Sequence, residues 1–287
     1  MTALFGQVAI GLLNGAFYAL LSLGLAIIFG LLNVINFAHG SLYMLGAFVA
    51  WGLLQYLHIG YWPALVIAPL LVGGLGIALE RTLLKHLYRL DPLYNLLLTF
   101  GVALIVQGLF QAKFGSSGEP YAIPEALRSS WNLGFMIMPV YRLWVLLASL
   151  VVCFATWFSI ERTKLGAYLR AATENPALVQ AFGINVPRMI TVTYGLGVAL
   201  AAFAGVLSAP INQVKPDMGA DLIIVVFAVV VIGGMGSIMG SILTGFALGL
   251  IEGLTKFYYP AASNTVVFVL MALVLLVRPA GLFGKAP

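Results

Sequence analysis

The chain has 287 residues, of which 62% are hydrophobic and 8% are charged. Soluble domains carry about 25% charged residues, so this composition excludes a soluble multidomain protein and requires lipid around most of the surface. The net charge of +5 does not indicate nucleic-acid binding, because the basic residues stand at the ends of apolar runs and form no long stripe. The single cysteine, Cys153, excludes an internal disulfide framework and a cysteine metal cluster.

Apolar runs long enough to cross about 30 Å of hydrocarbon recur along the chain. The first begins near Val8 without a preceding Lys or Arg and is too long for a cleaved signal peptide, so we expect the protein to retain it. We predict an all-α, polytopic transmembrane bundle of about eight to ten helices, some of them broken or re-entrant at glycines, in a single domain over residues 1–287. Nine segments are expected: 8–30, 36–57, 62–80, 95–112, 141–160, 188–209, 222–239, 241–258 and 264–277.

The positive charges predict the orientation of the chain. Nine of the 14 Lys and Arg residues cluster in three regions, which should be cytoplasmic because Lys and Arg accumulate in loops on that side. Three crossings between Asp221 and Arg278 agree with this assignment, which places the N-terminus outside and the C-terminus in the cytoplasm. The nine residues are Arg81, Lys85, Arg89, Arg162, Lys164, Arg170, Arg188, Arg278 and Lys285.

Two connections on the outer side are predicted to be irregular surface segments. The first, residues 114–139, contains "GSSGEP" and further prolines, and the second, residues 210–221, reads "PINQVKPDMGAD". Glycine, proline and short polar residues of this kind mark turns and loops. Neither connection is expected to form a separate domain.

Small residues recur every four positions on three of the predicted helices. This spacing puts them on one helical face and allows backbones to pack closely, which is ordinary for membrane helices and indicates architecture, not activity. The three sets are Ser237, Ser241, Gly245, Gly249 and Gly253; Gly197, Ala201, Gly205 and Ala209; and Gly11, Gly15 and Ala19.

The sequence offers no positive support for catalysis. It contains no G-x-x-x-x-G-K-S/T phosphate loop, so we expect no ATP hydrolysis by this route and no cofactor. The three histidines, His39, His58 and His86, are too scattered for a metal site. Glu252 stands inside an apolar run, where ionisable residues are costly and often functional; alternatively it forms an ion pair with Lys256 near the outer interface.

The stretch "NVINFAHGSLYMLGAF", residues 33–48, combines polar residues with a predicted helix start. Asn36 is a favourable N-cap, and a helix that starts there directs its free N–H groups toward the preceding break. A positive helix end inside a membrane protein suits an anionic group such as an amino-acid carboxylate. The alternative is that Asn33, Asn36 and His39 only satisfy the backbone of a turn between two spanning helices.

The cytoplasmic stretch at residues 161–190 is longer than a turn requires and predicts two short helices. In the second, Asn175 is the expected N-cap, Pro176 takes the first position and Gly183 ends the helix. Apolar faces are expected from Leu165, Tyr168 and Leu169 on the first helix and from Leu178, Val179 and Phe182 on the second. An apolar face outside the membrane needs a partner, which could be lipid headgroups or another protein.

Four motifs carry a resemblance to a known family. They are "INFAHG" at 35–40, the pattern G-x-x-x-R-A-x-x-x-N-P-x-x-x-x-x-x-G-I from Gly166 to Ile184, "GGMGS" at 233 and "RPAGLFG" at 278. In this order they resemble the LivH-like inner-membrane permeases of branched-chain amino-acid ABC importers over essentially the whole chain. The resemblance implies transport without ATPase activity in this chain.

The resemblance also implies partners and a location. Expected partners are a second related permease, two cytosolic ATP-binding subunits, a periplasmic solute-binding protein and membrane lipid, in a bacterial inner membrane with the N-terminus in the periplasm. The candidate contacts with the ATP-binding subunits are Gly166, Arg170, Ala171, Asn175, Pro176, Leu178, Phe182 and Gly183. The candidate residues of the translocation pathway are Asn33, Asn36, His39, Gly40 and Glu252.

Other functions stay open at this point. Permeases of this family also carry amides, urea or small carboxylates, and no residue here identifies a side-chain pocket. An ion-coupled secondary transporter would work without ATP-binding partners, but it would be expected to show more carboxylates inside the membrane.

Overall fold

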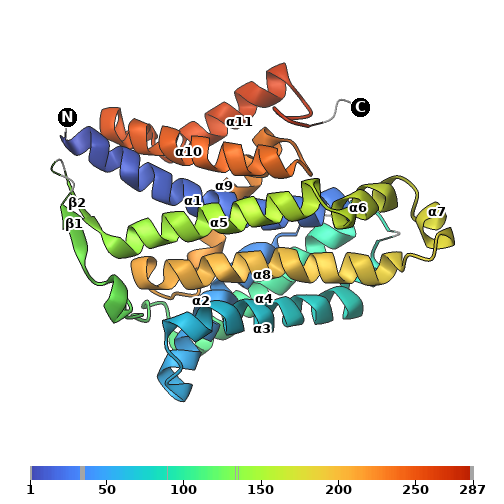
Figure 1. The fold of residues 1–287 in the computed structure, drawn as a ribbon, viewed down its shortest axis with the longest axis horizontal. Helices are drawn as coiled ribbons and strands as arrows, with labels where there is room; N and C mark the ends of the chain where they lie inside the picture. The colour runs from blue at the N-terminus through green and yellow to red at the C-terminus, as the bar shows by residue number, and fades with distance from the viewer. Residues whose placement is uncertain (1, 33–35, 89, 133, 135, 285–287) are drawn as a thin grey trace.

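The computed structural model describes residues 2–32, 36–88, 90–132, 134 and 136–284, in which long α-helices lie side by side (Figure 1). Seven helices in this part of the chain are apolar and long enough to cross a membrane, which confirms the predicted all-α polytopic bundle. They are α1 (Thr2–Leu32), α2 (Ala38–Leu57), α3 (Tyr61–Thr82), α4 (Pro92–Phe114), α5 (Val140–Glu161), α8 (Val186–Asn212) and α10 (Ile238–Tyr258).

Two further apolar helices are shorter, namely α9 (Met218–Gly233) and α11 (Val266–Val277). At 1.5 Å per residue they are about 24 and 18 Å long, less than the hydrocarbon thickness, as expected for broken segments. With the seven long helices they match the nine predicted segments. The remaining helices are α6 (Lys164–Glu174), α7 (Pro176–Ala181) and the 3₁₀ turns η1 (Leu84–His86), η2 (Glu125–Leu127) and η3 (Pro260–Ala262).

The predicted boundary between segments 222–239 and 241–258 is wrong. The break falls earlier, because Gly234 and Gly236 adopt φ angles of 98° and 83°, which interrupt the helix. The apolar composition continues through these residues, so hydropathy alone does not reveal the break. Ser237 leaves the predicted row of small residues and caps α10 instead, with its Oγ accepting a hydrogen bond from the Gly240 N–H at 3.1 Å.

The two connections expected to be irregular, residues 114–139 and 210–221, are more ordered than predicted. The first forms an antiparallel hairpin of β1 (Ser130–Asn132) and β2 (Ile137–Pro139), at the opposite end of the bundle from α7 (Figure 1). The two connections also pair with each other, because Glu119 and Val214 exchange backbone hydrogen bonds of 2.8 and 2.9 Å. Backbone pairing of this kind depends on residues far apart in sequence, which turn-forming composition does not report.

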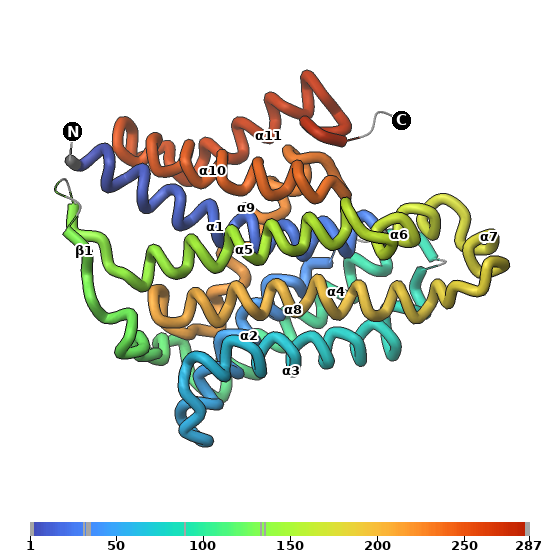
Figure 2. Tube along the Cα trace, in the orientation of Figure 1, coloured from blue at the N-terminus to red at the C-terminus, as the bar shows by residue number. Residues whose placement is uncertain are grey.

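Two of the predicted rows of small residues pack against each other, where α1 lies along α10 (Figure 2). A Cβ atom on Gly245 would lie 2.6 Å from the Ala19 nitrogen, and one on Gly11 would lie 2.6 Å from the Gly249 carbonyl oxygen. These distances are far below a normal van der Waals contact, so only glycine allows the two backbones to approach this closely.

The third row, on α8, packs against two helices. A Cβ atom on Gly197 would lie 2.8 Å from the Gly24 carbonyl oxygen of α1, and a Cβ atom on Gly205 would collide with the Tyr43 carbonyl oxygen of α2. The helices α1, α2, α8 and α10 therefore form a closely packed centre, and most of their apolar side chains there are buried.

Replacing Gly245 with Leu should destabilise the protein by about 2 kcal/mol, because the new side chain overlaps the α1 backbone and forces the helices apart. A lower melting temperature in mild detergent would report this loss. The matched control is Gly74→Leu on α3, where a new side chain meets no atom within 4 Å of its Cβ. Equal melting temperatures for the two variants would contradict the packing argument.

Candidate functional site

The close contact between the end of α5 and the start of α6, the α5–α6 joint, depends on Gly166. This glycine is buried, and a Cβ atom on it would collide with the carbonyl oxygen of Ile160 at the end of α5. Any larger residue must therefore displace α6. Gly166, a candidate contact with an ATP-binding subunit, faces the inside of the joint and not a free surface.

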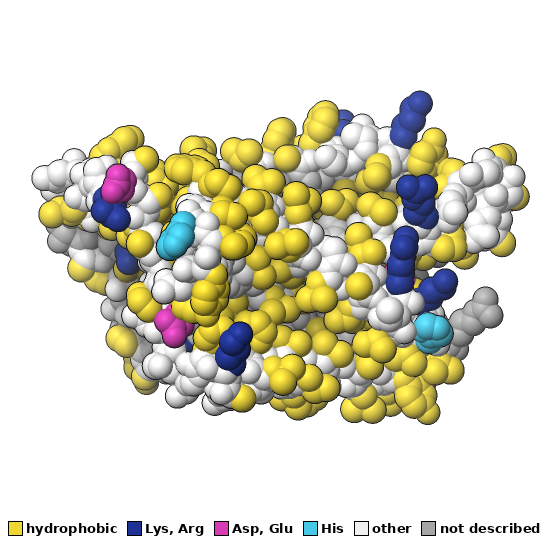
Figure 3. All heavy atoms as spheres, turned by 90° about the horizontal axis from the view of Figure 1, so that it is seen from below, with side chains coloured by type: hydrophobic (Ala, Val, Ile, Leu, Met, Phe, Trp, Pro, Cys, Tyr) yellow, Lys and Arg dark blue, Asp and Glu magenta, His cyan; other side chains and the backbone are white. Residues whose placement is uncertain are grey.

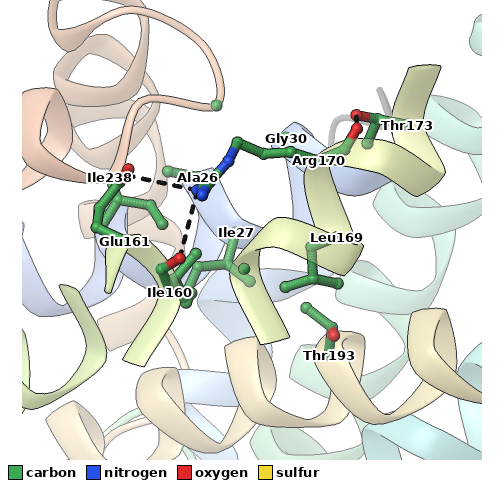
Figure 4. Close-up of a pocket in the computed structure, with 12 residues that line it drawn as sticks. Ala26, Ile27, Gly30, Ile160, Glu161, Leu169, Arg170, Thr173, Thr193 and Ile238 are labelled. Carbon is green, nitrogen blue, oxygen red and sulfur yellow. Dashed lines mark hydrogen bonds and ion pairs between the residues drawn. The ribbon is translucent and has the colours of Figure 1, made fainter. Parts of the chain in front are cut away.

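Arg170 reaches from α6 back to the end of α5 (Figure 4). Its guanidinium donates to the Ile160 carbonyl oxygen at 3.3 Å and to the Glu161 carboxylate at 3.4 Å. The side chains of this ion pair are 48% and 42% exposed, so solvent screens the pair and it adds little stability. The two residues border a cavity of about 100 Å³, which residues of α1, α5, α6, α8 and α10 line.

The predicted start and end of α7 are confirmed. The Asn175 Oδ1 accepts a hydrogen bond from the Leu178 N–H at 2.9 Å, and Pro176 follows at the first helical position. Gly183 has a φ of 81°, a left-handed conformation that ends the helix and that residues with a Cβ adopt at a cost.

The three apolar residues expected to form a face on α7 divide between two sides of the helix. Val179 is buried against Ala172 of α6 and Val186 of α8, whereas Leu178 and Phe182 are 55% and 78% exposed. A helix of six residues is not stable alone in water, so one side of it must pack against its own chain. On α6 the same division holds, since Leu169 is buried while Leu165 and Tyr168 are exposed.

Asn36, a candidate pathway residue, does not cap α2 as predicted. The helix begins one residue later than such a cap requires, with Phe37 at the N-cap position and no side-chain capping bond. The Asn36 side chain is 1% exposed and its Nδ2 donates to the Tyr194 hydroxyl of α8 at 2.8 Å. Its Oδ1 is buried and has no hydrogen-bond partner among the described residues. Asn33 lies outside the described residues.

The other candidate pathway residues point in different directions. His39 Nε2 lies 3.1 Å from the Leu21 carbonyl oxygen of α1, which can only accept, so this nitrogen carries the proton. Glu252 accepts a hydrogen bond from the Tyr18 hydroxyl at 2.6 Å, and the described ion pairs include none between Glu252 and Lys256. Gly40 packs against Gly219 of α9. The candidates therefore do not form one site.

Glu80 is a buried carboxylate that the sequence patterns did not single out. It is 2% exposed and accepts hydrogen bonds from the Tyr88 hydroxyl at 2.8 Å and from the Thr191 hydroxyl at 2.7 Å. Burial, and then the bond to Glu80, raise the pKa of Tyr88 above its usual range, so this phenol stays a donor. Glu80 thereby joins α3 to the first turns of α8. In the sequence, Glu80 stands beside Arg81 at the end of an apolar run, where charged residues ordinarily mark the membrane–water interface.

Comparisons with known proteins agree with the motifs. A family model described as "Branched-chain amino acid transport system / permease component" matches residues 7–277. The high-affinity branched-chain amino acid transport system permease protein BraD of Pseudomonas aeruginosa is 30% identical over 97% of this chain and 95% of its own length. LivH of Escherichia coli, which carries the same description, is 28% identical over 96% and 94%. A probable branched-chain amino acid transport permease protein LivH of Methanocaldococcus jannaschii is 30% identical over 92% and 88%. No solved structure gives a significant match.

Replacing Thr191 with Val should destabilise the protein by about 2 kcal/mol, because the isosteric change leaves the buried Glu80 carboxylate with one donor. Thermal unfolding in detergent would measure this. The control is Thr82→Val, which removes an exposed hydroxyl bonded only to its own helix at Ala78. A larger loss of thermal stability in Thr82→Val than in Thr191→Val would refute the assigned role of Glu80.

Replacing Asn175 with Ala should raise amide hydrogen exchange across α7 about fivefold, because the lost cap is worth about 1 kcal/mol. Mass spectrometry of peptides covering Pro176–Ala181 would detect the change. Gln180→Ala in the same helix removes no capping bond and should leave exchange unchanged. Similar exchange in both variants would contradict the capping role.

Proposed function

Because this chain belongs to the branched-chain amino acid transport permease family, we propose that it lines the membrane path of an ATP-driven importer for branched-chain amino acids. The observation that supports the coupling to ATP is the short helix α7, which holds Leu178 and Phe182 exposed beyond the spanning helices. Lipid tails cannot cover these side chains there. A protein partner that binds them explains why the chain maintains an apolar surface in water.

We assign this surface, formed by Ala171, Leu178 and Phe182, to a cytosolic ATP-binding subunit and call it the coupling surface. Two such subunits would supply the ATP hydrolysis for which the sequence has no phosphate loop. A second related permease would complete the path, and a periplasmic solute-binding protein would deliver the substrate. Gly166 and Arg170 would then act indirectly, by holding α6 and α7 at a fixed angle to α5.

We propose that the end of the bundle with α7 faces the cytoplasm of a bacterial cell. In the space-filling view a row of basic side chains lines this end without visible acidic ones, whereas at the opposite end basic and acidic side chains lie together (Figure 3). Lys and Arg accumulate on the cytoplasmic side of membrane proteins, which supports this orientation. If the two shorter apolar helices each carry the chain to the other side together with the seven long ones, the N-terminus would lie in the periplasm and the C-terminus in the cytoplasm.

Closure of the ATP-binding subunits would pull on the coupling surface and displace α7. Val179 would transmit this load, since it packs against Ala172 of α6 and Val186 at the start of α8. Helix α8 is bonded to α3 through Glu80 and to Asn36 through Tyr194. Movement of α7 would therefore tilt several helices together and open the path to a loaded binding protein, and hydrolysis would reset it.

Replacing Phe182 with Asp should abolish copurification of the ATP-binding subunits and reduce leucine uptake at least about tenfold, because a charge replaces a buried apolar contact of the complex. Membrane insertion should not change. The control is Ile137→Asp, the same exchange at a residue that is 68% exposed at the opposite end of the bundle. Normal copurification and uptake with Phe182→Asp would refute the coupling surface.

A further inference from the structure

A groove follows the outside of the bundle between α5 and α8, and a cavity of about 320 Å³ occupies it. Residues between 152 and 160 of α5 form one wall, and residues between 193 and 203 of α8 form the other. Both walls are open to the surroundings, since Leu196 is 51% exposed and Ala155 is also exposed. The groove therefore faces whatever surrounds the protein at this level of the bundle.

Other helices close the floor and one end of the groove. The buried residues Ile27 of α1 and Pro69 of α3 form the floor, and Leu165 and Leu169 of α6 lie at the end nearest α7. Helix α6, which leads to α7, is therefore in direct contact with whatever occupies the groove. The residues that the groove shares with the adjoining cavity of about 100 Å³ are Ile27, Ile160, Leu169 and Thr193 (Figure 4).

The length and position of the groove match one leaflet of a bilayer. At 1.5 Å per residue its walls are about 12 to 15 Å long, which is up to half of the roughly 30 Å hydrocarbon core. In the other half of α5 the two helices are bridged, because the Tyr141 hydroxyl donates to the Leu207 carbonyl oxygen of α8 at 2.9 Å. An acyl chain of one leaflet fits this groove, whereas a spanning helix of another protein crosses both leaflets and could not follow it.

The walls of the groove disfavour a free amino acid. None of the described residues that line it is charged, and its polar side chains are the hydroxyls of Thr156, Ser159 and Thr193. The Ser159 hydroxyl already donates to the Ala155 carbonyl oxygen at 2.7 Å. A carboxylate and an ammonium group would lie here without charged partners, which is costly, whereas a hydrocarbon chain loses nothing.

Basic side chains stand at the end of the groove nearest α7. Arg162 and Lys164 lie between the last lining residue of α5 and the first of α6, and Arg188 lies in the first turn of α8. All three are exposed, and the ion pairs of the described residues include none of them. The neighbouring Glu161 is paired with Arg170 instead. Basic sites between spanning helices attract the phosphates of anionic lipids.

We propose that this α5–α8 groove binds one anionic phospholipid from the leaflet on the α7 side. One acyl chain occupies the cavity, and the phosphate lies near Arg162, Lys164 and Arg188. The acyl chain packs on Leu165 and Leu169 and thereby supports α6, the helix that leads to α7. The preference for a charged headgroup distinguishes this site from the lipid layer around any membrane protein. The inference goes beyond the proposed function and does not depend on the transported substrate.

The test compares two lipids that have the same acyl chains. Native mass spectrometry of the full chain in mild detergent, titrated with dioleoyl phosphatidylglycerol or dioleoyl phosphatidylcholine, measures both affinities. The wild type should bind phosphatidylglycerol at least about fivefold more tightly, the effect of one basic side chain near a phosphate. Ala155→Leu fills the groove and should lower the affinity for phosphatidylglycerol at least about tenfold. Ala272→Leu, the same exchange at an exposed alanine of α11, should bind it like the wild type.

A second variant tests the headgroup contacts. Arg162→Gln combined with Lys164→Gln should lower the affinity for phosphatidylglycerol about 25-fold, fivefold for each charge, and leave that for phosphatidylcholine unchanged. Lys113→Gln removes a charge from the last turn of α4 and should change neither affinity.

Equal affinity of the wild type for the two lipids overturns the inference, because the groove then holds lipid without selection. Unchanged binding of phosphatidylglycerol by Ala155→Leu also overturns it. If that variant instead loses copurification of a second permease, the groove is a protein interface. If Ala155→Leu does not fold, the double glutamine variant decides, and an unchanged affinity for phosphatidylglycerol refutes the site.

Discussion

Close approach of helix backbones at small residues is the constraint on which the rest of this structure depends. Lipid tails are as apolar as leucine, so helices in a membrane associate through packing and hydrogen bonds. Helix α1 meets α10 through Gly11 and α8 through Gly24, and 83% of its most apolar window is buried, against 11% for α4. Helix α1 is therefore the central element, while α4 lies at the periphery with one side open to lipid or a partner.

A closely packed centre leaves little room for water, so buried polar side chains must find partners on neighbouring helices. Three side chains of α8 make such bonds. Tyr194 accepts from Asn36, which precedes α2, Ser208 accepts from Tyr43 of α2, and Thr191 donates to Glu80 of α3. Helix α8, which follows α7 in the chain, therefore ties α2 and α3 together.

The features that the sequence predicted correctly are those with local causes. The Asn175 cap bonds an N–H three residues away, and the rows of small residues follow the helical repeat. Apart from the helix break at Gly234 and Gly236, the failures involve distant partners. Asn36 resembles an N-cap in sequence, but its amide is drawn into the interior by Tyr194, 158 residues away. Glu80 finds Thr191 only when α3 packs on α8, 111 residues apart, and no pattern within either helix reports that contact.

Exposure alone does not distinguish the coupling surface from the rest of this apolar protein. Leu104 of α4 is 53% exposed and Leu178 of α7 is 55% exposed, but of the two helices α4 alone is long enough to span a membrane. Helix α7 differs because, within and directly after its six residues, Val179 packs against the rest of the chain while Leu178 and Phe182 stay exposed. Val179 fixes it to α6 and α8, and without that anchor a load on Phe182 would only unfold the helix. In the proposed coupling, the buried valine is therefore as necessary as the exposed phenylalanine.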